Sequence, residues 1–230
     1  LDGVRATLSD GISEVLESGK SVSADITYAF FGLPAYGEDS AATARLDALP
    51  AAILGHDRYT CDNDMICGWA GSLACEDGIN IIAGTGSMGY GQHQGASARV
   101  GGWGEAFSDE GSAYWIAIQG INAFSKMSDG RLPRGPLHGL LVQALGLKND
   151  LDLCAYVYGA GSTRDAIARL SLLVAEAARA GDAVALRIYE QAGTELAAIA
   201  ETLRSALGYA ADETIALSYS GGAFSAGELL

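Results

Sequence analysis

Apolar positions recur at two different spacings along the first third of the chain. A spacing of three and four residues is typical of an amphipathic helix, whereas a continuous run of β-branched and aromatic residues between turn signals indicates a buried strand. Proline and glycine mark where such elements stop. The expected elements are a helix over 3–18, a strand over Ile26–Leu33, a helix capped by Ser40 and running to Leu49, a strand over Arg58–Cys61 and a helix over Met65–Ala74.

The rest of the chain continues this alternation and becomes mainly helical toward its end. The turn signal Glu76-Asp77-Gly78 separates two regions of different composition, so we expect a domain boundary near residue 75, with domains over 1–75 and 76–230. Strands that alternate with helices indicate an α/β fold. The expected elements are a hairpin of strands over Ile79–Ala83 and Met88–Gln92, helices over Glu110–Phe124, Pro136–Leu145, Arg164–Ala180 and Ala183–Leu207, and a strand over Thr214–Ser218.

Composition and charge argue against several classes of partner. The 230 residues carry a formal net charge of −14, which disfavours a nucleic-acid backbone or an anionic membrane surface. No stretch reaches the roughly 20 apolar residues of a membrane span. The four cysteines show no CxxC pair or zinc spacing, and the three histidines are far apart. We therefore expect no metal site, and buried free thiols in the reducing cytoplasm.

Three of the expected strands end in polar or glycine-rich turns. Ligands of α/β proteins bind outside the carboxyl ends of strands, so these turns are expected to line one crevice. Glycines let the backbone approach a bulky anion, hydroxyls add donors, and a carboxylate beside them suits phosphoryl transfer to an alcohol. The three turns are Asp62-Asn63-Asp64, Gly84-Thr85-Gly86-Ser87 and Ser220-Gly221-Gly222.

Each candidate motif also has a purely structural interpretation. The glycines after residue 83 suit a tight β-turn, and Asp64 suits the cap or first turn of a helix, where the macrodipole favours an acid. Trp103, flanked by glycines, suits an exposed platform for a sugar face, with Asp109 accepting hydrogen bonds from vicinal hydroxyls. The alternative is a tryptophan buried at a domain seam and an Asp109 that caps the following helix.

Three segments together resemble one known family. They are Asn63-Asp64, Ile82-Ala83-Gly84-Thr85-Gly86-Ser87 and GGWGEAFSDEGSAYWI at residues 101–116. These segments are similar to motifs of the N-acetylglucosamine kinase and BadF/BadG/BcrA/BcrD ATPase family, a branch of the sugar kinase, heat-shock protein and actin superfamily. The segment from Arg164 to Asp182 and the turn Ser220-Gly221-Gly222 extend the resemblance over nearly the whole chain. It implies a two-domain, actin-like (ribonuclease H-like) α/β fold.

The resemblance implies a role for each matching residue. Asp64 matches the catalytic aspartate, which takes the proton of the sugar 6-hydroxyl as that hydroxyl attacks the γ-phosphate of ATP. The other matches are the ATP phosphate loop at Gly84, Thr85, Gly86 and Ser87, the adenosine motif at Gly221 and Gly222, and sugar contacts at Asn63, Asp64, Gly102, Trp103 and Asp109. ATP and Mg²⁺ are the implied cofactors.

The implied activity is phosphorylation of N-acetylglucosamine or glucosamine by a cytoplasmic kinase, and the resemblance also implies a homodimer. Two alternatives stay open: an activating ATPase of the same family, coupled to electron transfer through an iron–sulfur cluster, and a sugar-binding regulator without catalysis. The chain begins at Leu1, its first methionine is Met65, and the family's first phosphate loop, which helps to bind magnesium, has no match. We therefore expect a fragment that lacks the N-terminal hairpin and whose own activity is in question.

Overall fold

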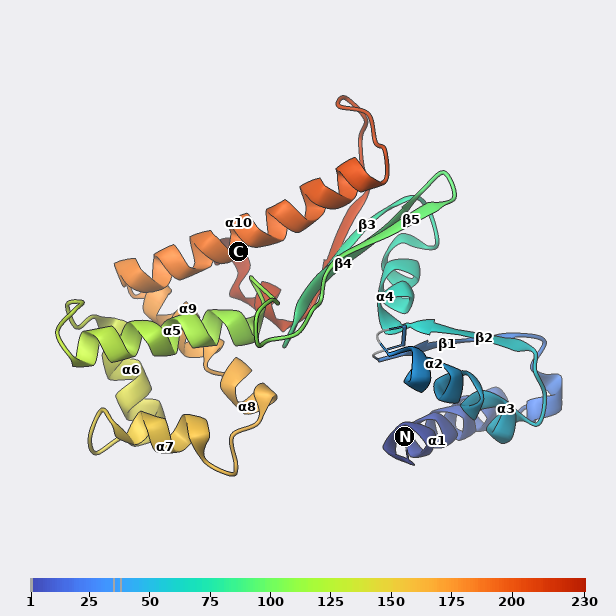
Figure 1. The fold of residues 1–230 in the computed structure, drawn as a ribbon, viewed down its shortest axis with the longest axis horizontal. Coiled ribbons are helices and arrows are strands. Elements are labelled where there is room, and N and C mark those ends of the chain that lie inside the picture. Colours follow the sequence, from blue (N-terminus) through green and yellow to red (C-terminus); the bar gives the residue numbers. More distant parts are fainter. Residues whose placement is uncertain (1, 35, 38) are drawn as a thin grey trace. The chain divides into compact units, whose positions relative to one another are not determined.

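The computed structural model describes residues 2–34, 36–37 and 39–230, and the chain divides into two units, Leu1–Ala70 and Gly71–Leu230 (Figure 1). The division falls inside helix α4 (Asp64–Leu73), whereas the change in composition at residues 76–78 follows that helix. The assignment of two actin-like domains to residues 1–75 and 76–230 stays a prediction.

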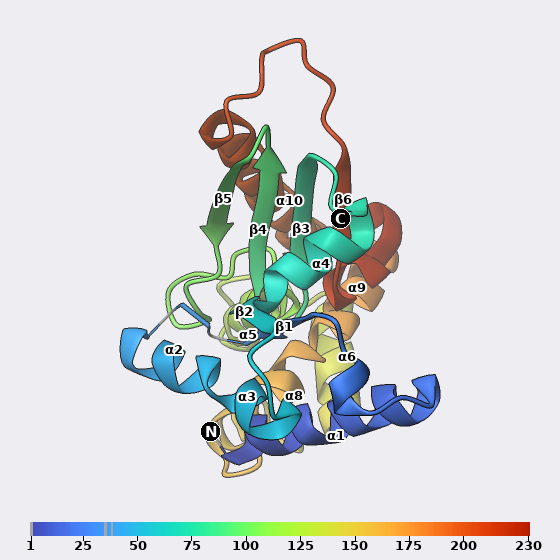
Figure 2. The same ribbon diagram turned by 90° about the vertical axis from the view of Figure 1, so that its right-hand side faces the viewer.

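Two parallel strands form the centre of the first unit. Strand β1 (Ala29–Leu33) pairs with β2 (Tyr59–Asn63) so that Leu33 lies opposite Asn63. Helices α1, α2 and α3 lie on one side of this pair in Figures 1 and 2, around a small core of Leu33, Leu46 and Cys61. The helical segments are α1 (Asp2–Gly19), the 3-10 helix η1 (Ser23–Asp25), α2 (Ser40–Asp47) and α3 (Leu49–Leu54).

Local backbone chemistry shifts several predicted boundaries in this unit. Asp39, not Ser40, caps α2, because its carboxylate accepts two N–H groups of the first helical turn. The predicted helix to Leu49 is two helices, since Pro50 lies in the first turn of α3, where its missing N–H costs no hydrogen bond. Strand β2 runs past its predicted end to Asn63.

The second unit is built on a sheet with the strand order β5-β4-β3-β6. Its strands are β3 (Gly78–Ala83), β4 (Ser87–His93), β5 (Ala96–Gly101) and β6 (Leu217–Ser220). The predicted hairpin is present, because β3 and β4 pair in antiparallel register, while β5 was not predicted. Strand β6 runs parallel to β3, with Ser220 opposite Ile82. The turns that follow β3 and β6 therefore lie at the same edge of the sheet.

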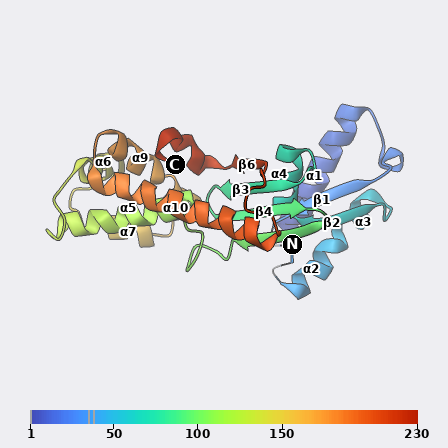
Figure 3. The same cartoon turned by 90° about the horizontal axis from the view of Figure 1, so that it is seen from above.

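Helix α10 (Ala183–Ala206) packs across one face of this sheet, as Figures 2 and 3 show. Two glycines of β4 allow the close approach. A side-chain carbon added to Gly89 would lie 2.6 Å from Leu203 Cδ1, and one added to Gly91 would lie 2.9 Å from Leu207 Cδ1. The sheet thus leaves space for Leu203 and Leu207.

The remaining helices pack against α10 and one another around the fully buried Phe124, Leu137 and Val174. The predicted helix over 164–180 is two helices, because 3-10 hydrogen bonds, such as Leu170 N–H to Ile167 O at 2.9 Å, tighten the turn between them. Helix α7 was not predicted. These helical segments are α5 (Ala113–Ser128), α6 (Pro136–Leu145), α7 (Asp152–Tyr158), α8 (Arg164–Ala168), α9 (Ser171–Arg179) and the 3-10 segment η2 (Gly222–Leu229).

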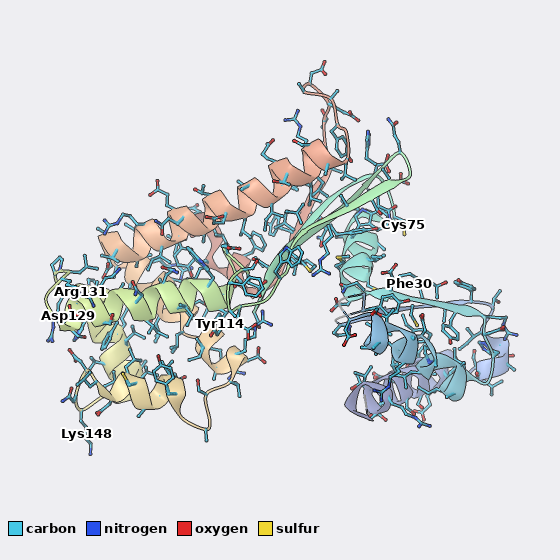
Figure 4. All side chains as sticks on the ribbon, in the orientation of Figure 1. Phe30, Cys75, Tyr114, Asp129, Arg131 and Lys148 are labelled. Carbon is cyan, nitrogen blue, oxygen red and sulfur yellow. The ribbon has the colours of Figure 1, made fainter. Side chains whose placement is uncertain are left out.

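The burial of the cysteines differs from the sequence-based expectation. Cys61 is buried, but Cys67, Cys75 and Cys154 are exposed, and all four thiols are free. The prediction of buried thiols is wrong for these three because Cys75 lies in the turn after α4 (labelled in Figure 4), while the other two lie on exposed positions of short helices. Across the described residues, no helix has both the length and the apolar character needed to cross a membrane.

Candidate functional site

The glycine-rich turn between β3 and β4 is held from both sides. Within the turn, Gly84 N–H donates to Gly86 O at 2.9 Å. The first residue of α5, Ala113, donates its N–H to Gly84 O at 2.9 Å, and Thr85 Oγ1 donates to Asp165 Oδ1 of α8 at 3.0 Å. The turn is tight, as its structural interpretation expects, and it is also fixed where two helices begin.

The two glycine motifs that are far apart in the sequence lie in direct contact. Gly221 has a φ of 110° and follows β6. A side-chain carbon at this position would overlap the carbonyl group of Ala83 and lie 2.6 Å from Gly84 N. Only glycine fits this approach, so the predicted adenosine motif rests directly on the predicted phosphate loop.

A pocket of about 460 Å³ opens beside these two motifs. Clefts of this size are typical of small-molecule sites. The predicted residues Gly84, Thr85 and Gly222 line it, and so do residues from the segment of α8 and α9, among them Asp165, Arg169 and Leu172. The sequence interpretation assigned no role to these last three. Their only signal was the resemblance of the segment that begins at Arg164.

The second half of the turn, Gly86 and Ser87, contacts the segment that contains Asp109. Ser87 is buried, and its hydroxyl donates to Glu110 O at 2.6 Å. A side-chain carbon on Gly86 would lie 2.8 Å from Asp109 Oδ2. Of the four predicted phosphate-loop residues, two therefore line the pocket and two contact the predicted sugar segment.

The predicted sugar segment pairs an exposed aromatic ring with a buried acid. Trp103 is 74% exposed, whereas Asp109 is 3% exposed. The alternative interpretation is wrong for Asp109, because the cap of α5 is Ser112, whose hydroxyl accepts Trp115 N–H at 3.1 Å. Phe107, 75% exposed in the same loop, was not predicted as a site residue.

The surroundings of the Asp109 carboxyl group shift its pKa in opposite directions. Burial raises the pKa of Asp109 above its usual range, and the Arg164 guanidinium and the backbone N–H of Gly104 offset only part of that rise. Arg164 Nη2 lies 2.5 Å from Asp109 Oδ2, and Gly104 N–H donates to Oδ1 at 3.4 Å. The charged form of this acid therefore depends on a small number of fixed donors.

Asn63 and Asp64 lie at the carboxyl end of the parallel strands in the first unit. Asn63 is 4% exposed; its Oδ1 accepts Met65 N–H at 3.2 Å, and its Nδ2 donates to Tyr36 O at 3.1 Å. Asn63 is thus the residue that caps α4, and Asp64 is the first residue of that helix. The Asp64 side chain is exposed, and its carboxylate makes no hydrogen bond to another residue in the part of the chain described.

Metal-binding groups are sparse. Among residues 2–34, 36–37 and 39–230, no group of three or more His, Cys, Asp or Glu side chains is arranged to hold a metal ion. Mg²⁺ in nucleotide sites commonly keeps waters and phosphate oxygens as ligands and uses one or two carboxylates. Asp165 is a carboxylate that lines the pocket and could serve in this way.

Comparison with known proteins gives one family and several relatives. The sequence profile of the BadF/BadG/BcrA/BcrD ATPase family matches residues 2–230. An N-acetylmuramic acid/N-acetylglucosamine kinase of Clostridium acetobutylicum is 42% identical over 135 residues, which are 58% of this chain and 44% of that protein. An N-acetyl-D-glucosamine kinase of Dictyostelium discoideum is 29% identical over 231 residues, 96% of this chain and 72% of that protein.

Solved structures show the same fold. A candidate N-acetylglucosamine kinase from Chromobacterium violaceum superposes with a TM-score of 0.76 at 24% identity, over 98% of this chain and 76% of that one. A second, from Porphyromonas gingivalis, has a TM-score of 0.59 at 19% identity, over 96% of this chain and 83% of that one. The predicted α/β, actin-like fold is confirmed.

Proposed function

Because the chain belongs to the BadF/BadG/BcrA/BcrD ATPase family, we propose that its protein is an ATP-dependent kinase that phosphorylates N-acetylglucosamine or glucosamine at the 6-hydroxyl. The observation that carries this proposal is the contact of Gly221 with the Ala83–Gly84 backbone, which joins the two glycine motifs beside one pocket. The names of two relatives, an N-acetylmuramic acid/N-acetylglucosamine kinase and an N-acetyl-D-glucosamine kinase, share N-acetylglucosamine and support the choice of sugar.

In this proposal the pocket holds ATP. Gly84 and Thr85 line the pocket, so the backbone of the turn lies beside the space proposed for the phosphates, and Gly222 lies against the adenosine. Mg²⁺ supplies charge neutralisation at the phosphates when it is bound. The contribution of this chain is to hold the phosphates on a turn that α5 and α8 keep in place.

The sugar is proposed to stack on Trp103, with Gly102 leaving room for its ring and Asn63 contacting its hydroxyls. Asp109 accepts hydrogen bonds from vicinal hydroxyl groups, which a carboxylate does through two oxygens. An exposed indole face and a buried acid in one loop fit a ligand that has both an apolar ring face and a polar edge.

Asp64 is the proposed general base. The sugar O6 forms a bond to the γ-phosphorus, the bond from that phosphorus to the bridging oxygen of ADP breaks, and the O6 proton passes to the Asp64 carboxylate. An exposed carboxylate without an internal hydrogen bond among the described residues is available for this transfer. A cytoplasmic location, where ATP is the phosphoryl donor, and a homodimer belong to the same proposal.

A coupled assay of ATP hydrolysis tests the proposal on the natural protein that contains this chain. ADP release is measured with N-acetylglucosamine, glucosamine, glucose and no sugar. We expect release that depends on an amino sugar. Release without sugar supports the activating ATPase instead, and sugar binding without any release supports the regulator.

The role of Asp64 has its own prediction. Asp64→Asn is expected to reduce turnover by at least about 100-fold, the scale of general base catalysis, while sugar affinity stays within a few fold. Asp62→Asn, two positions away at the end of β2, is the matched control and should keep its turnover. Unchanged turnover of Asp64→Asn removes this residue from the base role.

A further inference from the structure

Arg164 makes an ion pair for which neither the motifs nor the proposed reaction assigns a role. Its Nη2 lies 2.5 Å from Asp109 Oδ2, across 55 positions of sequence. Asp109 is almost completely buried, whereas the Arg164 side chain is 40% exposed. The arginine therefore reaches inward from the surface to a carboxylate that has lost nearly all of its contact with water.

The ion pair also lies directly against the phosphate loop. A side-chain carbon on Gly86 would be 2.7 Å from Arg164 Nη2 and 2.8 Å from Asp109 Oδ2. Position 86 thus needs a glycine to leave room for both charged groups. Arg164 therefore lies against both Asp109, the proposed sugar-binding residue, and Gly86 of the proposed phosphate loop.

The first turn of α8 keeps Arg164 in place. Thr163 caps this helix by accepting Ala166 N–H at 3.1 Å, and the next residue, Asp165, accepts the Thr85 hydroxyl at 3.0 Å. Arg164 Nε also lies 3.3 Å from Glu105 Oε2, in the loop that carries Trp103. The first two contacts hold the start of α8 in place, and the ion pairs with Glu105 and Asp109 fix the direction of the guanidinium group.

We propose that Arg164 is a positioning residue for sugar binding, which holds the buried Asp109 carboxylate in its charged form and in the orientation that accepts the sugar hydroxyls. The proposal rests on the proposed function, because it takes Asp109 as a sugar ligand. Arg164 acts through Asp109 and contacts no reacting atom.

The physical reason is the cost of burying a charge. A carboxylate removed from water strongly favours its neutral form unless an opposite charge compensates. The charged side chains that act on Asp109 are Arg164 from α8, which favours the carboxylate, and Glu105 from its own loop, which opposes it. Without Arg164, burial and Glu105 both raise the pKa of Asp109, and a protonated acid offers fewer acceptor sites to a sugar.

The test measures binding of N-acetylglucosamine by calorimetry between pH 6 and pH 8. The wild-type dissociation constant is expected to change less than about twofold over this range, because Arg164 keeps Asp109 charged. Arg164→Gln should weaken binding about tenfold at pH 8, because Asp109 loses its charged hydrogen-bond partner. Binding by this variant should weaken further as the pH falls. In the sugar-free protein, carbon-13 NMR should show a higher pKa for the Asp109 carboxyl in this variant.

A conservative variant and a control variant distinguish a positioning role of Arg164 from a general effect on protein stability. Arg164→Lys keeps the charge without the planar fork, so its affinity should be intermediate and its pH profile flat. This variant remains informative if Arg164→Gln does not fold. Arg131→Gln removes an exposed arginine that pairs with Asp129 at 2.6 Å beyond the end of α5 (Figure 4), and it should change neither affinity nor pH profile.

The outcomes are distinct. If Arg164→Gln binds the sugar with wild-type affinity, or loses affinity equally at every pH, the proposal is overturned. A steep pH profile in Arg164→Lys also overturns it. If the wild-type protein binds no amino sugar at all, the proposed function fails first, and the assignment of Arg164 to sugar binding fails with it.

Discussion

Gly221 illustrates how much one residue contributes to the candidate site. Its φ of 110° is a conformation that side chains rarely adopt, and its α-carbon lies against the backbone of Ala83 and Gly84. Any larger residue must move either the loop or β6. The contact between the two glycine motifs therefore depends on the absence of one side chain.

Gly221→Ala is expected to lower the free energy of unfolding by about 1–3 kcal/mol, because it combines backbone strain with an overlap. Nucleotide affinity should fall as well, since the loop has to move. Denaturant unfolding and ATP titration measure the two effects. Gly222→Ala is the matched control for stability, because no atom lies within 4 Å of the added carbon. Equal stability of the two variants would contradict the steric argument.

At the scale of elements, the Ala180-Gly181-Asp182 segment joins two helices and supports a third. Gly181, with a φ of 84°, ends α9. Asp182 begins α10, where its Oδ1 accepts Val184 N–H at 2.9 Å, and its Oδ2 accepts Leu137 N–H of α6 at 3.0 Å. The family-like segment is thus explained by helix termination and capping rather than by chemistry on a substrate.

Asp182→Ala should lower the free energy of unfolding by about 2–4 kcal/mol, because it removes the cap and leaves a buried N–H of α6 without its acceptor. Asp39 caps α2 in the same way but is exposed, so Asp39→Ala should cost only about 0.5–1 kcal/mol. Denaturant unfolding of both variants checks the difference. A small effect at Asp182 would show that its bond to Leu137 contributes little.

The elements also show where sequence interpretation succeeds. The strand Ile79–Ala83 and the long helix from Ala183 were predicted almost to their ends, because their apolar periodicity is strong and local. Strand β5 was not predicted, since Ala96–Gly101 has a single β-branched residue, Val100, and only its pairing with β4 makes it a strand. The break between α8 and α9 carries no glycine or proline signal.

At the scale of the whole molecule, one buried phenol makes stability depend on alkaline pH. Tyr189 is 3% exposed and donates its hydroxyl to Ser171 O at 3.1 Å. Burial raises its pKa to about 12. The unfolded chain releases this proton near pH 10, so between about pH 10 and 12 the native state binds more protons and stability falls as pH rises.

We expect this group to lower the free energy of unfolding by at most about 1.4 kcal/mol per pH unit above pH 10. Tyr189→Phe removes this part of the pH dependence and, at pH 8, costs about 1 kcal/mol for the lost hydrogen bond. Denaturant unfolding of both proteins at pH 8, 10 and 11 measures the difference. Curves that stay parallel over the three pH values would contradict the assignment.

The sequence by itself determined the alternation of strands and helices, the glycine turns at strand ends and the residue types of the candidate site. These features depend on spacing and composition within short segments, where propensity and periodicity act. Only the tertiary structure decided that Gly221 rests on Gly84, that Ser87 bonds to Glu110 and that Arg164 pairs with Asp109. Such contacts join distant segments through packing, and neither periodicity nor local propensity encodes which partners meet.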